Sequence, residues 1–591
     1  MAGFHFGDGS AGTNGIWIEG RARSDENASA VTVTIRLSSN LSPTINNWSQ
    51  LNTTVHGRLI AAAPLALICH EPNYNQTACE ALGEIWELPE THYPNPVEFM
   101  SPYWQNESCH PFTDPALPCT LGNYVDYTIN VSSAADVVAG LEFAQKNNIR
   151  ILIKNTGHDY LGKSTGRHAL GLWTHNLDSI HFLNYTGPSY NGSAVKLGAG
   201  AQAFDVYEAA AVRGLRVVGG ECPTVGLAGG YYQGGGHSAL GSTYGMGSDQ
   251  VLEWEVVTAE GKHLTASPQR NKDLYWALSG GGGGTYGVVL SVIVKAFEDG
   301  EVSGALIQFS SHDTIWSGVE ELHAQLPRLV DTGATVQYWI TNHTFTNAIV
   351  TAPGKTPEQV TDSLEPFRSR MDALQITTSV NITSFPTYIQ HFDHYLGPLP
   401  YGLRAINIID VSLAGRMIPR SVVESPDLNA KLIDVLKMSA DEDLDFTIGG
   451  VALHASHSTA GNSPSSNAVL PQWRHTILSL LLFSPWDYNG SFQSNVDAET
   501  YLIDTIVPAL KSLAPNGGAY LNEANHRQAD WKESFYGANY ERLLSIKKVY
   551  DPADLLYGPT AVGSDVWVPD SNGRLCRRAQ ENKGQRETNT D

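Results

Sequence analysis

The chain has 591 residues, more than one hydrophobic core usually supports, and 42% hydrophobic residues with 16% charged ones indicate a globular protein of several structural units. Its formal net charge of -23 argues against binding to nucleic acid or to an anionic membrane. We therefore expect a small neutral or cationic partner. The longest apolar run, Leu59 to Ile68, is too short to span a bilayer and is predicted to form a buried helix.

The first 45 residues are predicted to form a leader outside the fold. Residues 1 to 21 lack the basic and apolar regions of a signal peptide, and Ile18 to Arg21 spells a protease recognition sequence. We expect about the first 20 residues to come from an expression vector or from a wrongly assigned translation start. A charged tail from residue 571 to 591 is predicted to be disordered.

Cysteine and asparagine both indicate an oxidising compartment. Four cysteines form two close pairs, Cys69 with Cys79 and Cys109 with Cys119, although the sequence does not fix their connectivity. Zinc is a weaker explanation because no Cys-X-X-Cys or His-X3-His pattern accompanies them. Asn-X-Ser/Thr glycosylation motifs recur at Asn27, Asn47, Asn52, Asn75, Asn106, Asn130, Asn184, Asn191, Asn342, Asn381 and Asn489. The two features together favour a secreted, disulfide-bonded glycoprotein.

From Ser132 onward the chain alternates helix and strand patterns. Ser132 and Ser133 can cap a helix over Ala134 to Asn147, and Ile149 to Ile153 follows as a short buried strand. Further strands are predicted at Ala194 to Leu197, Leu215 to Val218 and Val288 to Phe297, with helices at Phe204 to Arg213 and Asp273 to Leu278. This part of the chain is predicted to be a layered β/α unit.

After Gly300 the strand patterns lie farther apart. They fall at Val336 to Thr341, Ile406 to Ala414 and Thr447 to Ala455, with an amphipathic stretch at Thr356 to Leu374, which predicts a second, α+β domain. Near the C-terminus we predict a short strand over Gly518 to Asn522 and a helix over Ala538 to Tyr550 that Pro552 cannot continue.

Cys222 stands apart from the paired cysteines, in the stretch GGECPTVG. Four interpretations are open: half of a disulfide with Cys576, a metal ligand, a nucleophile, or an attachment point for a cofactor. Glycine loops surround it. Gly198 to Ala203 fits a dinucleotide fingerprint or an ordinary tight turn, Gly282 to Gly287 has the wrong strand and helix order for that motif, and no P-loop occurs.

A polar turn, Lys154 to Gly162, follows the strand at Ile149 to Ile153. It carries His158 at a strand exit, where ligands bind in α/β layers, and Cys222 occupies a similar strand exit later in the chain. A capped surface histidine is the ordinary alternative. The matching positions indicate that the two residues are placed for a ligand.

Five segments together resemble one protein family. They are Lys154 to Gly162, Cys222 to Gly226, Gly234 to Ser238, Asn271 to Gly287 and Tyr536 to Pro552. In this order they resemble fungal berberine-bridge-enzyme-like flavoproteins of the vanillyl-alcohol-oxidase superfamily. In overall sequence character the chain is most similar to the isoamyl-alcohol-oxidase type. The resemblance covers roughly residues 46 to 567 and is far more specific than any single glycine loop.

The resemblance implies an α+β fold: a two-subdomain FAD-binding domain of the PCMH type with an inserted α+β substrate-binding domain. The implied organisation is an N-terminal extension over 46–122, the FAD-binding domain over 123–300, the substrate-binding domain over 301–515 and a C-terminal segment over 516–570 that completes the FAD domain. FAD would be attached covalently through His158 and Cys222. Further implied cofactor contacts are Asn155, Thr156, Gly157, Asp159, Thr224, Val225, Gly226, Gly229, Gly230, Gly236, His237, Gly284, Val288, Asn539 and Tyr540.

The resemblance also implies redox chemistry. Hydride would pass from a substrate carbon to flavin, and Val225, three residues after the cysteine, would leave room for O₂ as the electron acceptor, with H₂O₂ as the product. The substrate would be an alcohol, a hemiacetal or a sugar hydroxyl. The alternatives are a biosynthetic oxidase or cyclase that forms C–C or C=C bonds, and a non-redox flavoprotein that uses its cavity for binding or pericyclic chemistry.

A base must take the hydroxyl proton. Strand alternation over residues 518–522 would put Tyr520 and Asn522 on one face, so Tyr520 is predicted as base or substrate anchor, with Asn522 orienting it and Glu523 as the competing base. A tyrosine that only packs the sheet is the alternative. Tyr160, Trp473 and Arg474 are weaker candidates for the substrate cavity, and no metal site is predicted. We expect a monomer whose partners are a small molecule and O₂.

Overall fold

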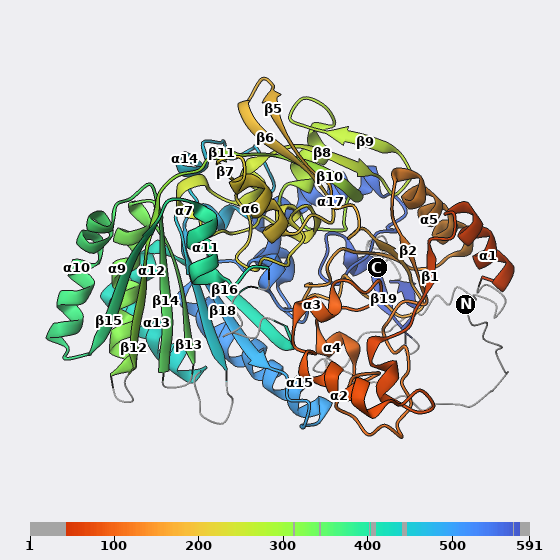
Figure 1. Ribbon diagram of the computed structural model, residues 1–591, viewed down its shortest axis with the longest axis horizontal. Helices are drawn as coiled ribbons and strands as arrows, with labels where there is room; N and C mark the ends of the chain where they lie inside the picture. Colours follow the sequence, from red (N-terminus) through yellow and green to blue (C-terminus); the bar gives the residue numbers. More distant parts are fainter. Residues whose placement is uncertain are drawn as a thin grey trace, which may run out of the picture. The chain divides into compact units, whose positions relative to one another are not determined.

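The structure is a computed structural model that describes residues 43–578 except 311–313, 342–343, 401, 403–408, 440–445 and 571–572. Most of the expected leader and of the expected tail therefore lies outside the described residues. The chain forms two compact units, residues 1–40 with 565–591, and residues 41–564. The larger unit holds nearly all of the described helices and strands (Figure 1). In the smaller unit, β19 (Trp567–Pro569) pairs antiparallel with β20 (Leu575–Arg577).

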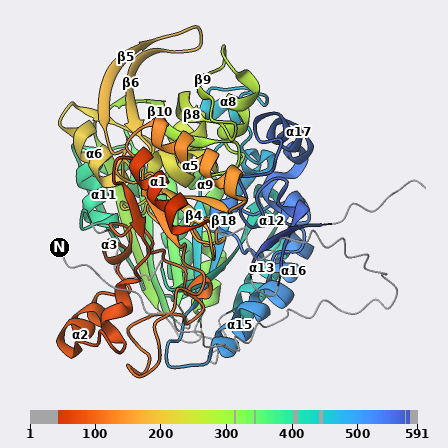
Figure 2. The same cartoon turned by 90° about the vertical axis from the view of Figure 1, so that its right-hand side faces the viewer.

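The first sheet of the larger unit has four strands in the order β1-β2-β4-β3. They are β1 (Leu59–Ala61), β2 (Tyr127–Asn130), β3 (Ile151–Lys154) and β4 (Leu170–Trp173), and both β2 and β3 run parallel to β4. Helix α5 (Ala134–Asn147) covers this sheet, with α1 (Ile45–Thr54) beside it (Figure 2). Val137 and Leu141 of α5 are buried against Leu170 and Leu172 of β4. The helix has the bounds that its apolar spacing predicts, but the expected serine cap is wrong: Ser133 makes no side-chain cap hydrogen bond, and the hydroxyls of Ser132 and Ser133 donate to Asp136 instead.

The second sheet is antiparallel, in the order β5-β6-β10-β8-β9. Its strands are β5 (Ile180–Thr186), β6 (Asn191–Gly198), β8 (Val251–Val257), β9 (His263–Ala266) and β10 (Val288–Lys295). Helices α6 (Ala203–Ala211) and α8 (Lys272–Leu278) accompany it, and β7 (Leu215–Arg216) pairs with β11 (Phe297–Glu298). The predicted strand at Val288 to Phe297 is thus divided into β10 and β11, and the one at Leu215 to Val218 is shorter than expected.

The third sheet is antiparallel, in the order β15-β12-β14-β13-β17-β18-β16. Its strands are β12 (Val302–Ser310), β13 (Thr335–Thr341), β14 (Thr344–Pro353), β15 (Thr378–Phe385), β16 (Val411–Pro419), β17 (Thr447–Ala452) and β18 (Thr476–Pro485). Its packing helices are α9 (Ile315–Asp331), α10 (Pro357–Ala373), α13 (Pro426–Met438) and α16 (Val507–Leu513) (Figures 1 and 2). All of these strands lie within the segment predicted as the substrate-binding domain. The strand expected at Ile406 to Ala414 begins only at Val411, and residues 403–408 are not described.

The two faces of the third sheet bury different sets of side chains. Because successive side chains alternate, Val336, Tyr338 and Ile340 of β13 enter the core formed with the helices. Gln337 and Trp339 point to the opposite face and line a cavity. Val451, Leu481 and Phe483 lie on that second face too, in a cluster with Trp473 and Tyr520. The sheet therefore contributes one wall of the site described below.

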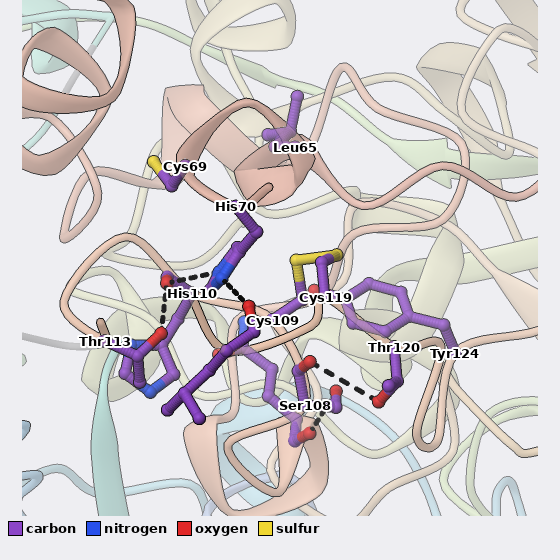
Figure 3. Close-up of a disulfide and its surroundings, with 12 residues drawn as sticks. Leu65, Cys69, His70, Ser108, Cys109, His110, Thr113, Cys119, Thr120 and Tyr124 are labelled. Carbon is purple, nitrogen blue, oxygen red and sulfur yellow. Dashed lines mark hydrogen bonds between the residues drawn. A yellow bond between two sulfur atoms is a disulfide. The ribbon is translucent and has the colours of Figure 1, made fainter. Parts of the chain in front are cut away.

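The N-terminal extension consists of short helices held by two disulfides. They are η1 (Leu65–Cys69), α2 (Gln76–Glu84), α3 (Pro89–His92) and α4 (Pro102–Gln105). The disulfides join Cys69 to Cys79 and Cys109 to Cys119, and Figure 3 shows the second one with His70 near it. The His70 ring nitrogens lie within hydrogen-bond distance of the carbonyls of Leu117 and His110. The predicted helix over Leu59 to Ile68 is wrong. Strand β1 pairs with β2 there, and Pro64, which has no N–H, separates it from η1.

The C-terminal segment packs against both the first and the second sheet. The strand predicted over Gly518 to Asn522 is wrong: Ala519 N donates to Ser534 O, and η6 (Leu521–Glu523) is a single tight helical turn. Helix α17 (Tyr540–Tyr550) starts two residues later than predicted. Near its end Lys547 donates to Asp551 and to the carbonyls of Thr285 and Leu556, which ties the segment to the glycine-rich loop before β10.

The remaining elements connect the sheets. They are η2 (Leu227–Tyr231), α7 (Gly241–Tyr244), η3 (Gly247–Gln250), α11 (Tyr388–Leu396), α12 (Arg420–Val423), α14 (His457–Ala460), η4 (Pro471–Arg474), α15 (Phe492–Tyr501), η5 (Leu502–Ile506), η7 (Lys532–Tyr536), η8 (Gly537–Asn539) and η9 (Ser564–Val566). Within the described residues, no helix combines the length and apolarity that crossing a bilayer requires.

Candidate active site

A cavity of about 420 Å³ lies where the three sheets and the C-terminal segment meet. The first two sheets and their loops contribute many glycines, and the third sheet contributes Trp339, Val451, Leu481 and Phe483 together with Gln337 and two glycines. Its lining includes Asn155 to Tyr160, Glu221 to Pro223, Val225, Gly226, Gly229, Gly230, His237, Gly283, Gly284, Gln337, Trp339, Leu481, Phe483, Tyr520, Asn522 and Glu523. Segments far apart in the sequence therefore form one site.

Two loops bring His158 and Cys222 into this cavity. Strand β3 ends at Lys154, and the loop turns at Gly157, whose φ of +92 favours glycine. The carboxylate of Asp159 then accepts the backbone N–H groups of Leu161, Lys163 and Ser164, which fixes the shape of the loop. The second loop is pinned to the start of α6, because Ala203 N and Phe204 N donate to the carbonyls of Val225 and Pro223.

His158 and Cys222 are neighbours across these loops. The distance from His158 Nε2 to Cys222 Sγ is 4.0 Å, and Thr224 Oγ1 lies 2.9 Å from the nitrogen and 3.4 Å from the sulfur. Burial, helped by His92 and Lys154, lowers the pKa of His158 to about 3, so its imidazole is neutral. Burial raises the pKa of the Cys222 thiol, so it carries its proton at neutral pH. Both Cys222 and Cys576 are free cysteines.

Glycines on the wall of the same cavity leave space that a side chain would fill. A Cβ at Gly230 would meet no atom within 4 Å, and one at Gly283 would come no closer than 3.4 Å to any neighbour. Asn155 closes one side: its Nδ2 donates to Ala199 O at 2.6 Å and to Thr174 Oγ1, while its Oδ1 is buried without a partner. A glycine-lined space with an unpaired acceptor and a neutral imidazole fits a flavin dinucleotide, whose phosphates need close approach of backbone N–H groups.

Some residues predicted to contact the cofactor are not on the cavity wall. Thr224 lies behind it and bonds His158 and Cys222, as above. Gly236 packs against the ring of Tyr231, Val288 begins β10, Asn539 donates to Ala468 O and Val469 O, and Tyr540 Oη accepts from Gly563 N. Their hydrogen bonds support the backbone around the cavity.

Tyr520 and Asn522 are paired, although the segment is not a strand. The turn η6 brings Asn522 Nδ2 to 2.8 Å from Tyr520 Oη and 3.1 Å from Gly230 O. Burial, with Glu523 nearby, raises the pKa of Tyr520 well above its ordinary value, so the phenol stays protonated. Trp473 stacks edge-on against Tyr520 at 5.6 Å. Arg474 instead pairs with Asp249 at 2.8 Å, away from the cavity lining.

His237 is held between two glutamates. Its Nδ1 lies 3.0 Å from Glu221 Oε2, and its Nε2 lies 2.7 Å from Glu523 Oε1. Burial alone would lower the pKa of His237, but the two carboxylates raise it well above its ordinary value. Sequence reasoning missed Glu221 as a site residue and expected only a cofactor contact at His237. No local pattern reveals this group, because its members come from three separate segments.

Two parts of the chain match known protein families: residues 125–267 match the family model "FAD binding domain", and residues 519–563 match "Berberine and berberine like". The VAO-type flavoprotein oxidase VAO615 of Thermothelomyces thermophilus is 46% identical over 90% of this chain and 93% of that protein. The chain belongs to the VAO-type flavoprotein family. As a member it is an FAD-linked oxidoreductase, and both the predicted family and the predicted α+β fold are confirmed.

A solved structure and a second fungal protein are also similar to this chain. The crystal structure of the VAO-type flavoprotein MtVAO615 from Myceliophthora thermophila C1 has a TM-score of 0.87 and 45% identity, covering 92% of this chain and 99% of that one. The bifunctional decalin synthase calF of Penicillium decumbens is 44% identical over 90% of this chain and 94% of that protein. Proteins this similar are therefore named both as oxidases and as a synthase.

Proposed function

We propose that the protein is an FAD-dependent oxidase of an alcohol, hemiacetal or sugar hydroxyl. The observation that carries this proposal is that His158 and Cys222 line the same cavity as Tyr520, Asn522 and Glu523. When bound, the flavin accepts a hydride from the substrate carbon and returns the electrons to O₂, which becomes H₂O₂. The protein's own groups bind the substrate hydroxyl and receive its proton.

His158 and Cys222 would attach the cofactor covalently at two points. Both side chains line the cavity, 4.0 Å apart, and the neutral imidazole of His158 has a free electron pair for bond formation. Thr224 holds both side chains in place. Acid precipitation tests this attachment: the wild type and the separate His158→Ala and Cys222→Ala variants should keep yellow flavin in the pellet. Release of free FAD from the wild type would contradict double attachment.

Tyr520 is better suited to anchor the substrate than to act as its base. Its buried phenol keeps its proton, while Asn522 donates to the phenol oxygen, so the hydroxyl proton is available for a substrate oxygen. Glu523, the predicted competing base, lines the same cavity; its Oε1 lies 2.7 Å from His237 Nε2, and its Oε2 is buried. It is the one carboxyl group among the three predicted catalytic residues, and we propose it as the proton acceptor.

Oxygen would reach the cofactor beside Val225. This half-buried valine lines the cavity between Cys222 and Gly226. A larger aliphatic side chain there would occupy space that a small diatomic molecule needs. The position supports O₂ as the electron acceptor.

We also propose that the protein is secreted as a monomeric glycoprotein. The disulfides at Cys69–Cys79 and Cys109–Cys119 are typical of oxidising compartments. Several glycosylation motifs have exposed asparagines: Asn75, Asn106, Asn184, Asn191, Asn381 and Asn489. Material from a eukaryotic host should lose mass on enzymatic deglycosylation, and an unchanged mass would count against secretion. Its partners would be a small molecule and O₂, not nucleic acid or membrane.

A turnover screen tests the oxidase proposal. Primary and secondary alcohols, lactols and sugars are incubated with the enzyme under air, and H₂O₂ is measured together with loss of substrate. Stoichiometric H₂O₂ with a carbonyl product supports the proposal. A second candidate is C–C or C=C bond formation in a secondary metabolite, which the similarity to the decalin synthase favours. Substrate conversion without a carbonyl product would indicate that function, and a reducible flavin without any redox turnover would leave a binding or pericyclic role.

A further inference from the structure

A single lysine lines the cavity among several acidic residues. Of the described residues on the cavity wall, Lys163 is the only lysine or arginine. The acidic residues of the wall are Glu87, Glu90, Asp159, Glu221 and Glu523. The charge on His237 is balanced by Glu221 and Glu523, one on either side of its ring. Because carboxylates repel an anion in a weakly screened site, a cofactor with a diphosphate needs a positive charge here.

The ammonium group of Lys163 is available for such an anion. No hydrogen bond or ion pair joins this group to a described residue. The carboxylate of Asp159 accepts the backbone N–H groups of Leu161, Lys163 and Ser164 instead. Burial lowers the pKa of Lys163, and Asp159 raises it. A half-buried ammonium without a partner loses hydration without compensation, and a bound anion would remove this cost.

Two segments hold the Lys163 side chain at the cavity. Because Asp159 accepts the Lys163 N–H, the loop after β3 turns back on itself between these two residues. The stem of Lys163 lies against Gly558, where a Cβ would come within 2.8 Å of Lys163 Cγ. Gly558 also lines the cavity and follows Leu556, which forms a β-bridge with Ile151 at the start of β3. Lys163 therefore lies on the side of the cavity that the first sheet forms.

The predicted substrate anchor lies on another side of the cavity. Tyr520 belongs to a cluster with side chains of the third sheet. Besides burial, Glu523 and Glu221 act on the pKa of Tyr520, whereas Asp159 acts on that of Lys163. An anion at Lys163 would thus be separate from the group that reacts.

Backbone N–H groups of the same loop are also without acceptors. Those of Thr156, Gly157 and His158 make no hydrogen bond to a described residue. All three residues line the cavity, and Gly157 has a left-handed backbone with φ of +92. Successive N–H groups in such a turn form concave sites for phosphate oxygens. They would add donors to the charge of Lys163.

We propose that Lys163 is the counter-ion of the diphosphate of FAD and that the N–H groups of residues 156–158 complete this anion site. The inference rests on the FAD-dependent activity proposed above. Its chemistry is recognition alone: the ammonium donates charge-assisted hydrogen bonds to phosphate oxygens, and no covalent bond forms or breaks. Lys163 would thus select a dinucleotide, whereas His158 and Cys222 hold the flavin ring.

Reversible flavin binding tests this role without turnover. The background protein His158→Ala/Cys222→Ala lacks both attachment points, so its flavin can be removed and titrated back. Flavin fluorescence gives Kd for FAD and for riboflavin, which has the same ring but no phosphate. Adding Lys163→Met should raise Kd for FAD by about 10 to 100-fold, the effect of losing one hydrogen bond to a charged group. It should leave Kd for riboflavin unchanged.

Lys262→Met in the same background is the matched control. It removes one positive charge at the surface, where Lys262 Nζ lies 2.6 Å from Glu260, and should leave both Kd values unchanged. Lys163→Arg keeps the charge and should restore most of the affinity for FAD. An unchanged Kd for FAD in Lys163→Met would overturn the inference. An equal loss for FAD and riboflavin would overturn it too, because that result indicates damage to the fold.

A competition experiment identifies the anion. Inorganic diphosphate should displace FAD from the background protein and should do so less well after Lys163→Met. Acetate at the same ionic strength should not displace it. Equal competition by acetate would assign Lys163 to a carboxylate and overturn the diphosphate site.

The proposed function can fail separately from this inference. FAD binding that depends on Lys163, without H₂O₂ from any hydroxyl compound, would contradict the oxidase reaction and leave the anion site standing. A wild-type protein that takes up no FAD would contradict both.

Discussion

Burial decides the chemical role of Tyr520 at the scale of a single residue. Its ring is enclosed by Trp473 and His237, and Asn522 donates to its oxygen, so the phenol remains protonated and offers one hydrogen to the cavity. A tyrosine on an exposed strand would titrate normally. The surroundings, not the residue type, make it an anchor.

Tyr520→Phe should therefore lower kcat by about 10²-fold, the effect of removing one donor that stabilises a reacting oxygen. KM should change less than kcat, because the contact strengthens as charge develops. Steady-state kinetics with H₂O₂ detection measures both values. Tyr185→Phe, a half-buried position in β5, is the control and should match the wild type. Unchanged kcat in Tyr520→Phe would leave Tyr520 as a packing residue.

Val225 is expected to affect only one of the two half-reactions of the proposed oxidase, the reoxidation of the flavin by O₂. Val225→Leu should slow reoxidation of the reduced flavin by O₂, because the added methylene fills space beside Cys222. Reduction of the flavin by substrate under anaerobic conditions should keep its rate. Stopped-flow measurement of the two steps distinguishes them, and equal slowing of both would assign Val225 to substrate binding instead.

At the scale of elements, β13 and β17 pair and form part of one cavity wall. Strand β17 can pack closely in this place because it carries Gly449 and Gly450. Gly450 lies opposite Tyr338 in the register of these strands, and a Cβ there would come within 2.2 Å of Tyr338 Cζ. The phenol of Tyr338 is itself fixed by the His323 ring at 2.7 Å. The strand can therefore lie against the core only without a side chain at 450.

Gly450→Ala should reduce the free energy of unfolding by about 1–3 kcal/mol through overpacking. Gly83→Ala in α2 is the control: its Cβ would meet only Phe112 at 3.7 Å, and alanine favours a helix by about 0.5–1 kcal/mol. Urea unfolding followed by fluorescence compares the two variants. Equal stability of Gly450→Ala and the wild type would mean that Tyr338 moves aside without cost.

Elements with a clear local pattern could be predicted, and elements that depend on distant partners could not. The helix Ala134–Asn147 has the predicted bounds, because its apolar spacing lies within the segment itself. The run from Leu59 to Ile68 was mistaken for a helix, because pairing with β2 decides its structure. The strand expected around Tyr520 was wrong for a similar reason, since the turn η6 is fixed by contacts with other segments.

The site follows the same rule. His158 and Cys222 could be predicted as a pair because each ends a recognisable strand–loop pattern. Glu221 could not be predicted as a partner of His237 and Glu523, since only the folded chain brings these three segments together. Chemistry that depends on long-range charge pairs therefore needs the structure.

At the scale of the larger unit, one buried ion pair connects two segments that lie 225 residues apart in the chain. Asp249 lies in η3, directly before β8. It accepts two hydrogen bonds from Arg474 of η4, both at 2.8 Å. Asn462 and Asn467 also donate to Asp249. Both charged side chains are nearly inaccessible, 0% and 5% exposed. Losing one partner would leave a desolvated charge in the interior.

Arg474→Met should lower the free energy of unfolding by about 3–5 kcal/mol at pH 7, because Asp249 would lose its counter-ion. Burial alone would raise the pKa of Asp249, but Arg474 and the amides hold it below its ordinary value of 3.8. The stabilisation is thus complete above about pH 4 and is lost as the pH falls through the lower, folded-state value, so the wild type and the variant should converge in acid. Arg420→Met, which breaks a partly exposed pair with Asp331, is the matched control and should cost at most about 1 kcal/mol. Urea unfolding at pH 3 and pH 7 measures how much less stable Arg474→Met is than the wild type at each pH. An equal loss of stability at both pH values would assign the effect to packing rather than to charge.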